Sequence, residues 1–295
     1  MPTAATAPEF RSKALETKPQ QALQLHVVLL ADRLEYLALG AEPGSVVLYG
    51  AVPFAGGASQ AQALHEALAT PSLKLPFKQT VLTLGLPFWT LVPEKYLAGS
   101  HNLSPIKFIE TLYGLDPEAY EARQTELPGQ DTLLLYGYPH ALKPLLGAEL
   151  AQAQVRHLVQ PLLATSRLLH QRSAAPVSLH VQLLGAEAYY VLQRGKELIF
   201  CNRFEAAHPE DALFYALSVV QQFGLPKDKV MVMLTGRSPY RQALEAQLAK
   251  AFGDKYLRVR TFYAKHPELN AAGLQLDELA FVTEGLLLPE KVGAK

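Results

Sequence analysis

The stretch LHVVLL at residues 25–30 returns almost unchanged as LHVQLL at residues 179–184. Solenoid proteins repeat every 20 to 50 residues or so, whereas these two copies lie about half of a 295-residue chain apart. A repeat at this distance indicates duplicated domains. The segments that come after the two copies should therefore match in kind.

The same order of predicted elements does come after each copy. Short segments rich in β-branched and aromatic residues, separated by turn formers, are typical of a meander of three strands. These segments lie at 25–31, 34–39 and 45–54 in the first half, and at 179–184, 188–193 and 196–204 in the second. A helical pattern then leads to another apolar strand, with helices at 59–69 and 209–223 and strands at 79–85 and 229–236.

After these matched elements the two halves differ. The first half adds a predicted helical region at 93–113, a strand at 132–138, a helix at 140–146, a candidate strand at 155–160 and a helix at 161–171. The second adds a helix at 238–252, a strand at 256–263 and a closing helix at 276–287. We therefore expect a disordered lead-in at 1–22, a first half at 23–173 and a second half at 174–295.

Composition narrows the class of protein. Hydrophobic residues make up 49% of the chain and charged residues 18%, which supplies ample core for two domains. The 27 basic residues cancel the 27 acidic ones, so net charge gives no support to nucleic-acid or membrane binding. Apolar runs end well short of the roughly 18 residues that a membrane helix needs. With no signal-peptide pattern in 1–22 and a single cysteine, Cys201, we expect a cytoplasmic protein.

A βββαβα unit occurring twice in tandem resembles the actin-like ATPase (ribonuclease H-like) fold, an α/β fold with mixed sheets and an interdomain cleft. The pattern KELIFCNRFEAAHPEDALFYALSVVQQFGL at 196–225, followed by VMVMLTG at 230–236, is similar to a bacterial family known as domain of unknown function 3822. The segment TLVPEKYL at 90–97 and the spacing to His157 also fit that family. The resemblance covers nearly the whole chain and implies an actin-like fold with no established activity.

In catalytic actin-like proteins, the turn between the first two strands of each half grips phosphate. Such a turn needs glycines, so that backbone N–H groups can approach the phosphate oxygens, and an aspartate to organise Mg²⁺. Here the turns read LADRLEY at 30–36 and LLGAEAY at 183–189. Asp32 stands without a glycine, and Gly185 stands without an aspartate. Ordinary turn chemistry explains both residues and is the leading interpretation, with phosphate binding as the alternative.

A third segment, LTGRSPYRQAL at 234–244, resembles the adenosine-contacting turn of actin-like ATPases, which typically carries two adjacent glycines. Gly236 fills the first of these places and Arg237 the second. The start of a helix could hold an anion there, with help from Arg237. We favour a structural interpretation, because Ser238 as N-cap and Pro239 at the first helical position explain the helix start without a ligand.

Other residues that could carry chemistry give weaker signals. The nine histidines never pair at metal-ligand spacing, and no CxxC, HExxH or GxSxG motif is present, so neither a metal site nor a nucleophile elbow is supported. The acidic residues of HPED at 208–211 fit the first turn of a helix better than acid–base catalysis. His26 and His180 occupy equivalent places in the repeat, on apolar strands, which favours buried core histidines.

Two functions remain open from the sequence. The leading hypothesis is a non-catalytic actin-fold protein that needs no cofactor and binds a protein partner or serves as a scaffold. The alternative is a divergent ATP-binding protein, either an ATPase or an enzyme similar to sugar kinases, that uses ATP with Mg²⁺ in the interdomain cleft. The candidate nucleotide-binding residues are Asp32, Gly185, Gly236, Arg237 and Ser238.

Overall fold

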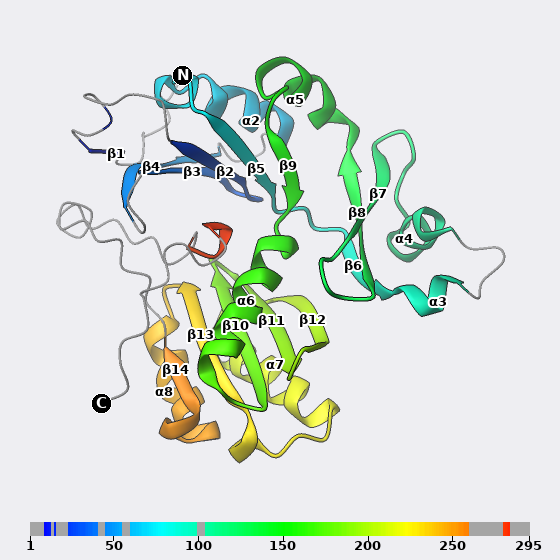
Figure 1. The fold of residues 1–295 in the computed structure, drawn as a ribbon, viewed down its shortest axis with the longest axis vertical. Helices are drawn as coiled ribbons and strands as arrows, with labels where there is room; N and C mark the ends of the chain where they lie inside the picture. Colours follow the sequence, from blue (N-terminus) through cyan, green and yellow to red (C-terminus); the bar gives the residue numbers. More distant parts are fainter. Residues whose placement is uncertain are drawn as a thin grey trace. The chain divides into compact units, whose positions relative to one another are not determined.

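The computed structural model describes residues 9–12, 15, 23–40, 45–54, 60–98, 104–259 and 280–283. The chain divides into two compact units, and the boundary near the middle of the sequence falls between Gln160 and Pro161. Each unit contains a mixed β-sheet with helices packed against it (Figure 1). None of the described helices is long and apolar enough to cross a membrane.

The main sheet of the first unit has six strands in the order β1-β4-β3-β2-β5-β9. The strands are β1 (Phe10–Arg11), β2 (Gln24–Leu29), β3 (Arg33–Leu39), β4 (Val46–Pro53), β5 (Gln79–Leu84) and β9 (Gln154–His157). The meander β2-β3-β4 is antiparallel, whereas β5 runs parallel to β2 and β9 runs parallel to β5.

The sheet of the second unit has five strands in the order β12-β11-β10-β13-β14. They are β10 (Val177–Leu184), β11 (Glu187–Arg194), β12 (Glu197–Glu205), β13 (Met231–Arg237) and β14 (Leu257–Val259). Their directions repeat those of β2, β3, β4, β5 and β9 one for one. The duplication predicted from the two LHV stretches is therefore confirmed, and β2 and β10 lie in separate sheets.

The register repeats as well. In each unit a valine of the central strand lies between a tyrosine and a leucine, namely Val27 between Tyr36 and Leu82, and Val181 between Tyr190 and Leu234. Both central strands have hydrogen-bonded neighbours on either side and side chains buried on both faces. A strand in this position needs a nearly continuous apolar sequence, which is why the LHV stretches are so alike.

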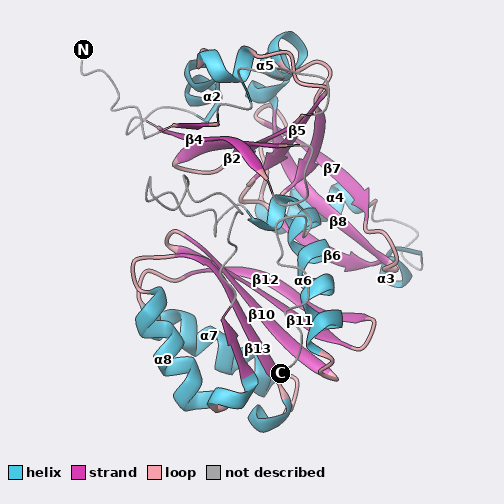
Figure 2. Ribbon diagram, turned by 60° about the vertical axis from the view of Figure 1, so that its left-hand side comes forward, coloured by secondary structure: helices cyan, strands magenta, loops and turns pink. Residues whose placement is uncertain are grey.

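Helices complete the core of each unit. In the first unit, α2 (Gln60–Leu68) and α5 (Lys143–Glu149) contact each other and lie on one face of the main sheet (Figure 1). In the second, α7 (Pro209–Gln222) and α8 (Arg241–Phe252) cover one face, while α6 (Val159–Ser173) lies on the other (Figure 2). Side chains of β10 alternate between these layers, because Val181 joins the core beneath α7 and α8, whereas Ser178 is hydrogen-bonded to His170 of α6. Short 3₁₀ turns join these elements at Pro71–Lys74, His140–Leu142, Lys227–Lys229, Asp254–Tyr256 and Ala280–Thr283.

An insertion between β5 and β9 distinguishes the first unit from the second. It contains an antiparallel sheet in the order β6-β8-β7 and two short helices. Its elements are β6 (Trp89–Pro93), α3 (Glu94–Ala98), α4 (Pro105–Tyr113), β7 (Tyr120–Glu126) and β8 (Thr132–Pro139). Strand β8 was predicted, but β6 and β7 were not. The sequence of β7, YEARQTE, consists mostly of good helix formers, so only pairing with β8 gives it strand structure.

Residues 1–22 were predicted to be disordered, and the structure corrects this prediction at Phe10 and Arg11. These residues form β1 and pair with β4, so the prediction is wrong for them. The Glu9 carboxylate fixes the strand, since it accepts hydrogen bonds from the Tyr36 hydroxyl and from Ser72 Oγ at 2.6 Å, and pairs with Arg11 Nε at 2.7 Å. The preceding residues, 1–8, lie outside the described part of the chain.

Three predicted elements end elsewhere. The candidate strand at 155–160 is β9, which ends at His157, where α6 begins after a single residue. The strand predicted at 256–263 is described only as β14, up to Val259. Of the closing helix predicted at 276–287, residues 280–283 are described and form a single 3₁₀ turn. The rest of both segments lies outside the described residues.

The contact between Gly50 and Tyr36 provides a test of how β1 is held. A Cβ at Gly50 would lie 2.3 Å from the Tyr36 hydroxyl, so Gly50→Ala must displace the ring that holds Glu9. We expect a loss of about 1–3 kcal/mol in the free energy of unfolding. The matched control is Gly147→Ala on α5, where a Cβ meets nothing within 4 Å and should stabilise by about 0.5–1 kcal/mol. Urea denaturation measures both, and equal effects of the two variants would contradict this account.

Candidate functional site

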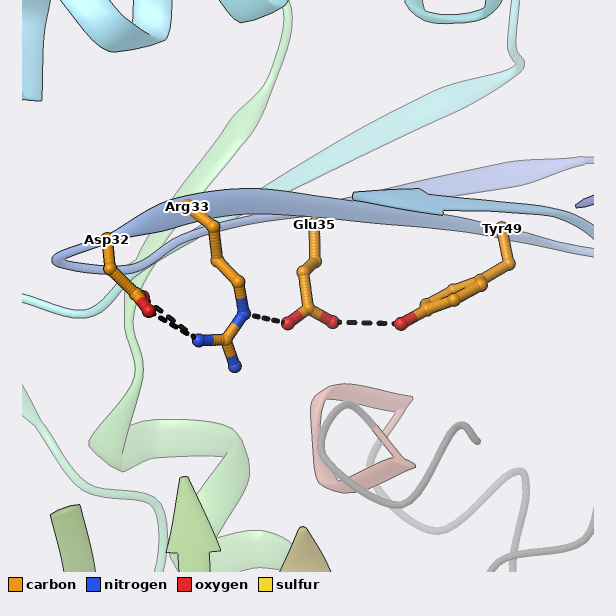
Figure 3. A network of polar contacts seen from close by, with 4 residues as sticks. All are labelled: Asp32, Arg33, Glu35 and Tyr49. Atoms are coloured by element: carbon orange, nitrogen blue, oxygen red, sulfur yellow. Dashed lines mark hydrogen bonds and ion pairs between the residues drawn. The ribbon is translucent and has the colours of Figure 1, made fainter. Parts of the chain in front are cut away.

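The first hairpin turn contains a chain of polar contacts centred on Arg33 (Figure 3). Arg33 Nη1 lies 2.9 Å from Asp32 Oδ1 and 3.0 Å from Asp32 Oδ2. Arg33 Nε donates to Glu35 Oε1, and the Tyr49 hydroxyl donates to Glu35 Oε2 at 3.3 Å. The Glu35 side chain is 2% exposed and the Asp32 side chain 70%. Asp32 is thus the outermost member of a buried-to-exposed ionic chain.

This arrangement sets the electrostatics of the turn. One nitrogen of the Arg33 guanidinium contacts both carboxylate oxygens of Asp32, the atoms that a Mg²⁺ ion or its water would use, so a cation approaching Asp32 meets a positive charge beside it. Two carboxylates and one guanidinium leave one net negative charge among Asp32, Arg33 and Glu35, which disfavours an approaching phosphate. The contact between Arg33 and Glu35 could have been predicted from the sequence. Residues two apart on a strand point to the same face, so these two side chains are neighbours.

The second hairpin turn uses its glycine for geometry. Gly185 has φ +65° and is the first of two residues between Leu184 and Glu187, the place that a type II′ hairpin gives to glycine. Its backbone N–H donates to the Arg237 carbonyl at 3.3 Å. The donor that phosphate binding would need is therefore already engaged. Next to it, Ala186 stands in the place of Asp32, since the carbonyl of each accepts a 2.8 Å hydrogen bond from the third strand of its meander.

Gly236 is required by close packing of two strands. It has φ +85° on β13, and a Cβ there would lie 2.0 Å from the Leu183 carbonyl oxygen and 2.3 Å from Gln182 Nε2. The Gly236 carbonyl accepts a hydrogen bond from Arg241 Nη1 at 2.7 Å. The absence of a side chain therefore lets β13 approach β10, and this contact explains the glycine without a ligand.

The predicted N-cap at Ser238 is wrong. Helix α8 begins at Arg241, and its N-cap residue is Tyr240. A turn precedes the helix, closed by the Arg241 N–H donating to the Ser238 carbonyl at 3.1 Å, so Pro239 occupies the second position of this turn and not the first of the helix. Ser238 Oγ lies 3.5 Å from the Tyr240 nitrogen, a long contact. The Arg237 side chain is exposed.

Four of the five candidate residues lie close together in the second unit. The hydrogen bond from Gly185 to the Arg237 carbonyl joins the β10–β11 turn to the end of β13, which also carries Gly236 and leads into Ser238. Asp32 belongs to the first unit. No group of three or more His, Cys, Asp or Glu side chains that could hold a metal occurs among the residues the structure describes.

A buried polar network behind this turn was not predicted. His180 Nε2 lies 2.5 Å from Thr235 Oγ1, which in turn donates to Gln182 Oε1 at 2.7 Å. Because the threonine hydroxyl directs its proton to Gln182, it accepts the Nε2 proton of a neutral His180. Burial lowers the pKa of His180 to about 3, which keeps the ring neutral. The network ends where Gln182 Nε2 donates to the Leu183 carbonyl at 2.9 Å.

The first unit carries a related but different set. His26 is buried in the place of His180, and neither of its ring nitrogens has a hydrogen-bond partner within the described residues. Burial, with a smaller contribution from the positive charge of Arg156, lowers the pKa of His26 to about 4. Thr83 takes the place of Thr235 and accepts a 3.1 Å hydrogen bond from Arg156 Nε. His26 and His180 were predicted to be satisfied core histidines. Burial is confirmed for both, but only His180 has a hydrogen-bond partner within the described residues.

The acidic cluster in HPED is part of a helix start, as predicted. Pro209 begins α7, and Asp211 Oδ2 accepts the backbone N–H of His208 at 3.0 Å. This contact satisfies an N-terminal donor and places a negative charge where the helix dipole favours it. Cys201 is half-buried on β12, and burial raises the pKa of its thiol, which keeps it protonated.

Substitutions along this ionic chain should lower the free energy of unfolding by different amounts. Asp32→Asn removes an exposed ion pair and should lower the free energy of unfolding by about 1 kcal/mol or less. Arg33→Gln leaves the buried Glu35 carboxylate without its guanidinium and should cost about 3 kcal/mol, part of which Glu35→Gln restores in the double variant. Urea denaturation of the unmodified protein, the two single variants and the double variant measures these costs. An Asp32→Asn cost as large as that of Arg33→Gln would show that Arg33 serves the turn and not Glu35.

The two buried histidines predict acid sensitivity. Each has a folded-state pKa below the unfolded value of about 6.5, so the unfolded chain binds more protons below that pH. The contribution of the neutral histidines to the free energy of unfolding should be fully present above pH 6.5. It should fall as the pH drops toward 4, by at most about 1.4 kcal/mol per pH unit for each histidine. His26→Gln and His180→Gln should each flatten this slope in denaturation curves taken between pH 7 and 4. An unchanged slope in both variants would contradict burial of neutral rings.

Comparisons with known proteins agree with this architecture. A Bacteroides thetaiotaomicron protein with actin-like ATPase fold and unknown function is 14% identical, with 93% of this chain and 98% of that chain covered and a TM-score of 0.69. A chain of the PilM-PilN type IV pilus biogenesis complex is also 14% identical, with 90% and 97% covered and a TM-score of 0.51. These similarities confirm the predicted actin-like ATPase fold.

The family is shown by the sequence itself. No curated protein matches the chain. The family model described as "Protein of unknown function (DUF3822)" matches residues 12–252, which include every strand of the two main sheets except β1 and β14. The match therefore runs through both copies of the repeat and both hairpin turns. This protein belongs to the DUF3822 family.

Proposed function

We propose that this protein is a non-catalytic actin-fold protein that binds a protein partner and has no nucleotide cofactor. The observation that carries the proposal is that the candidate phosphate-binding groups are committed to contacts within the chain. The Asp32 carboxylate pairs with Arg33, and the Gly185 N–H is bonded to the Arg237 carbonyl.

A nucleotide would have to displace contacts that the two turns already make. Phosphoryl transfer depends on donors and a metal that are already positioned for the phosphate. Here Mg²⁺ would have to displace a guanidinium from Asp32, and a phosphate oxygen would have to displace a carbonyl from Gly185. Each internal hydrogen bond that has to be broken costs about 1 kcal/mol, a cost that a turn with free donors would not carry.

Exposed apolar side chains support a binding role. Helix α4 buries Ile109 against the inserted sheet but leaves Ile106, Leu112 and Tyr113 exposed. Large apolar side chains grouped on one surface helix are typical of protein contacts. The similar fold of PilM, determined in a complex with PilN, provides an example of an actin-fold protein with a protein partner. A single cysteine in the whole sequence supports a reducing, cytoplasmic setting.

Addition of Mg-ATP tests the proposal against the ATP-binding alternative. A ligand present at 100 times its dissociation constant stabilises a protein by about 2.7 kcal/mol, a shift that thermal melting detects easily. We expect no shift at millimolar Mg-ATP, no phosphate release above the buffer blank, and the same result for Asp32→Asn. A nucleotide-binding actin-like protein measured in the same buffer is the positive control. A saturable shift or Mg-dependent turnover that Asp32→Asn removes would establish the ATP-binding function instead.

A further inference from the structure

The outer edge of β12 has backbone groups directed away from its sheet. The strand has nine residues and pairs only with β11 among the described strands. Its phase is fixed by the Ala206 N–H, which donates to the Ala186 carbonyl at 2.8 Å, so from Ala206 back to Phe200 every second residue bonds to β11. A shift of register opposite Leu192 and Gln193 ends this alternation. The residues between them, including Cys201 and Arg203, direct their N–H and C=O outward. The Arg203 N–H is bonded to the Asn202 side chain at 2.8 Å.

The duplicated fold shows what this edge can accept. In the first unit, β4 holds the position of β12, and its outer edge is covered by the antiparallel strand β1. Phe10 pairs with Tyr49, and the Ser12 N–H donates to the Val47 carbonyl at 2.9 Å. Tyr49 is the counterpart of Cys201. Each lies five residues before the residue whose backbone N–H donates to the first hairpin turn of its unit. One sheet thus carries an added strand where the other, within the described residues, carries none.

Aromatic side chains lie beside this edge, on the side of the sheet covered by α7. Phe204 of β12 stacks on Tyr215 of α7 with ring centroids 4.2 Å apart and planes 5° apart. Tyr215 in turn contacts Phe214 at 5.4 Å, and Phe214 is 63% exposed. We call these three residues the aromatic ledge. An exposed phenylalanine next to a half-buried aromatic stack offers apolar area to a segment that lies along β12.

We propose that β12 accepts an extended segment of a partner protein as an additional antiparallel strand. Side chains at alternate positions of that segment pack on the aromatic ledge, because successive side chains of a strand point to opposite faces. Exposed Glu197 and Glu205 flank the strand, so the segment carries basic residues at its ends. This inference rests on the proposed binding function and specifies its surface and the chemistry of the partner.

A synthetic peptide can test the edge directly. The probe has nine residues, matching the length of β12, with Phe and Thr alternating and Lys at both ends. The same peptide with its central residue replaced by proline is the control. We expect binding of the first peptide only, with hydrogen exchange at the Cys201 amide slowed at least tenfold. Slowed exchange confined to amides outside β12, or no binding of the alternating peptide, would overturn the proposal.

Two variants test the backbone edge of β12 and the aromatic ledge independently. Cys201→Pro removes an outward N–H without removing a bond to β11, and should weaken peptide binding at least tenfold. Phe214→Ala, at an exposed position that should not affect folding, should weaken binding several-fold and keeps the test decisive if Cys201→Pro fails to fold. Unchanged affinity in Phe214→Ala, or in a folded Cys201→Pro, would overturn the proposal.

The outcomes also separate this inference from the proposed function. Slow exchange of the Cys201 amide that depends on protein concentration, without peptide, would assign the edge to a second copy of this chain and overturn the choice of partner. Failure of the peptide to bind while Mg-ATP also has no effect would overturn the edge and leave the non-catalytic function standing. A Mg-ATP shift would contradict the proposed function regardless of the peptide result.

Discussion

Burial of the central strands on both faces is the constraint on which the rest of the structure depends. Every residue of β10 is buried, so each of its side chains must be apolar or be hydrogen-bonded inside the unit. Gln182 and the Nε2 atom of His180 meet this requirement through Thr235 on the neighbouring parallel strand, whereas His180 Nδ1 has no partner within the described residues. Strand β2 has the same position with only one polar side chain on its buried face, His26, because Val28 stands in place of Gln182.

The same constraint determines what the turns can do. Gly236 lets β13 approach the end of β10 closely, and the hydrogen bond from Gly185 to the Arg237 carbonyl continues the contact into the turn. Groups that could have pointed toward a nucleotide thus extend the sheet. In the first unit the turn is determined differently, since the buried Glu35 holds Arg33, and Arg33 holds Asp32. In both units, the contacts of the turn thus continue into the interior behind it.

Much of the fold could be predicted because hydrophobic pattern and turn formers report on burial. The two meanders, the helix and strand after each, and the duplication itself can be read from apolar runs such as LHVVLL. Strand β7 could not be predicted, since its partly buried, helix-forming sequence becomes a strand only through pairing with β8. The two-residue β1 depends on the side-chain contact of Glu9 with Tyr36, which leaves no periodic signal. At Ser238 a local rule failed because a turn occupies the residues before α8.

The proposed function requires that the Gly185 amide is held by the sheet and does not serve as a phosphate donor. Hydrogen exchange at this amide, followed by NMR with and without Mg-ATP, tests this requirement. We expect exchange of the Gly185 amide to be slowed by its bond to the Arg237 carbonyl and to be the same with and without nucleotide. Rapid exchange in the free protein that slows on addition of Mg-ATP would contradict it.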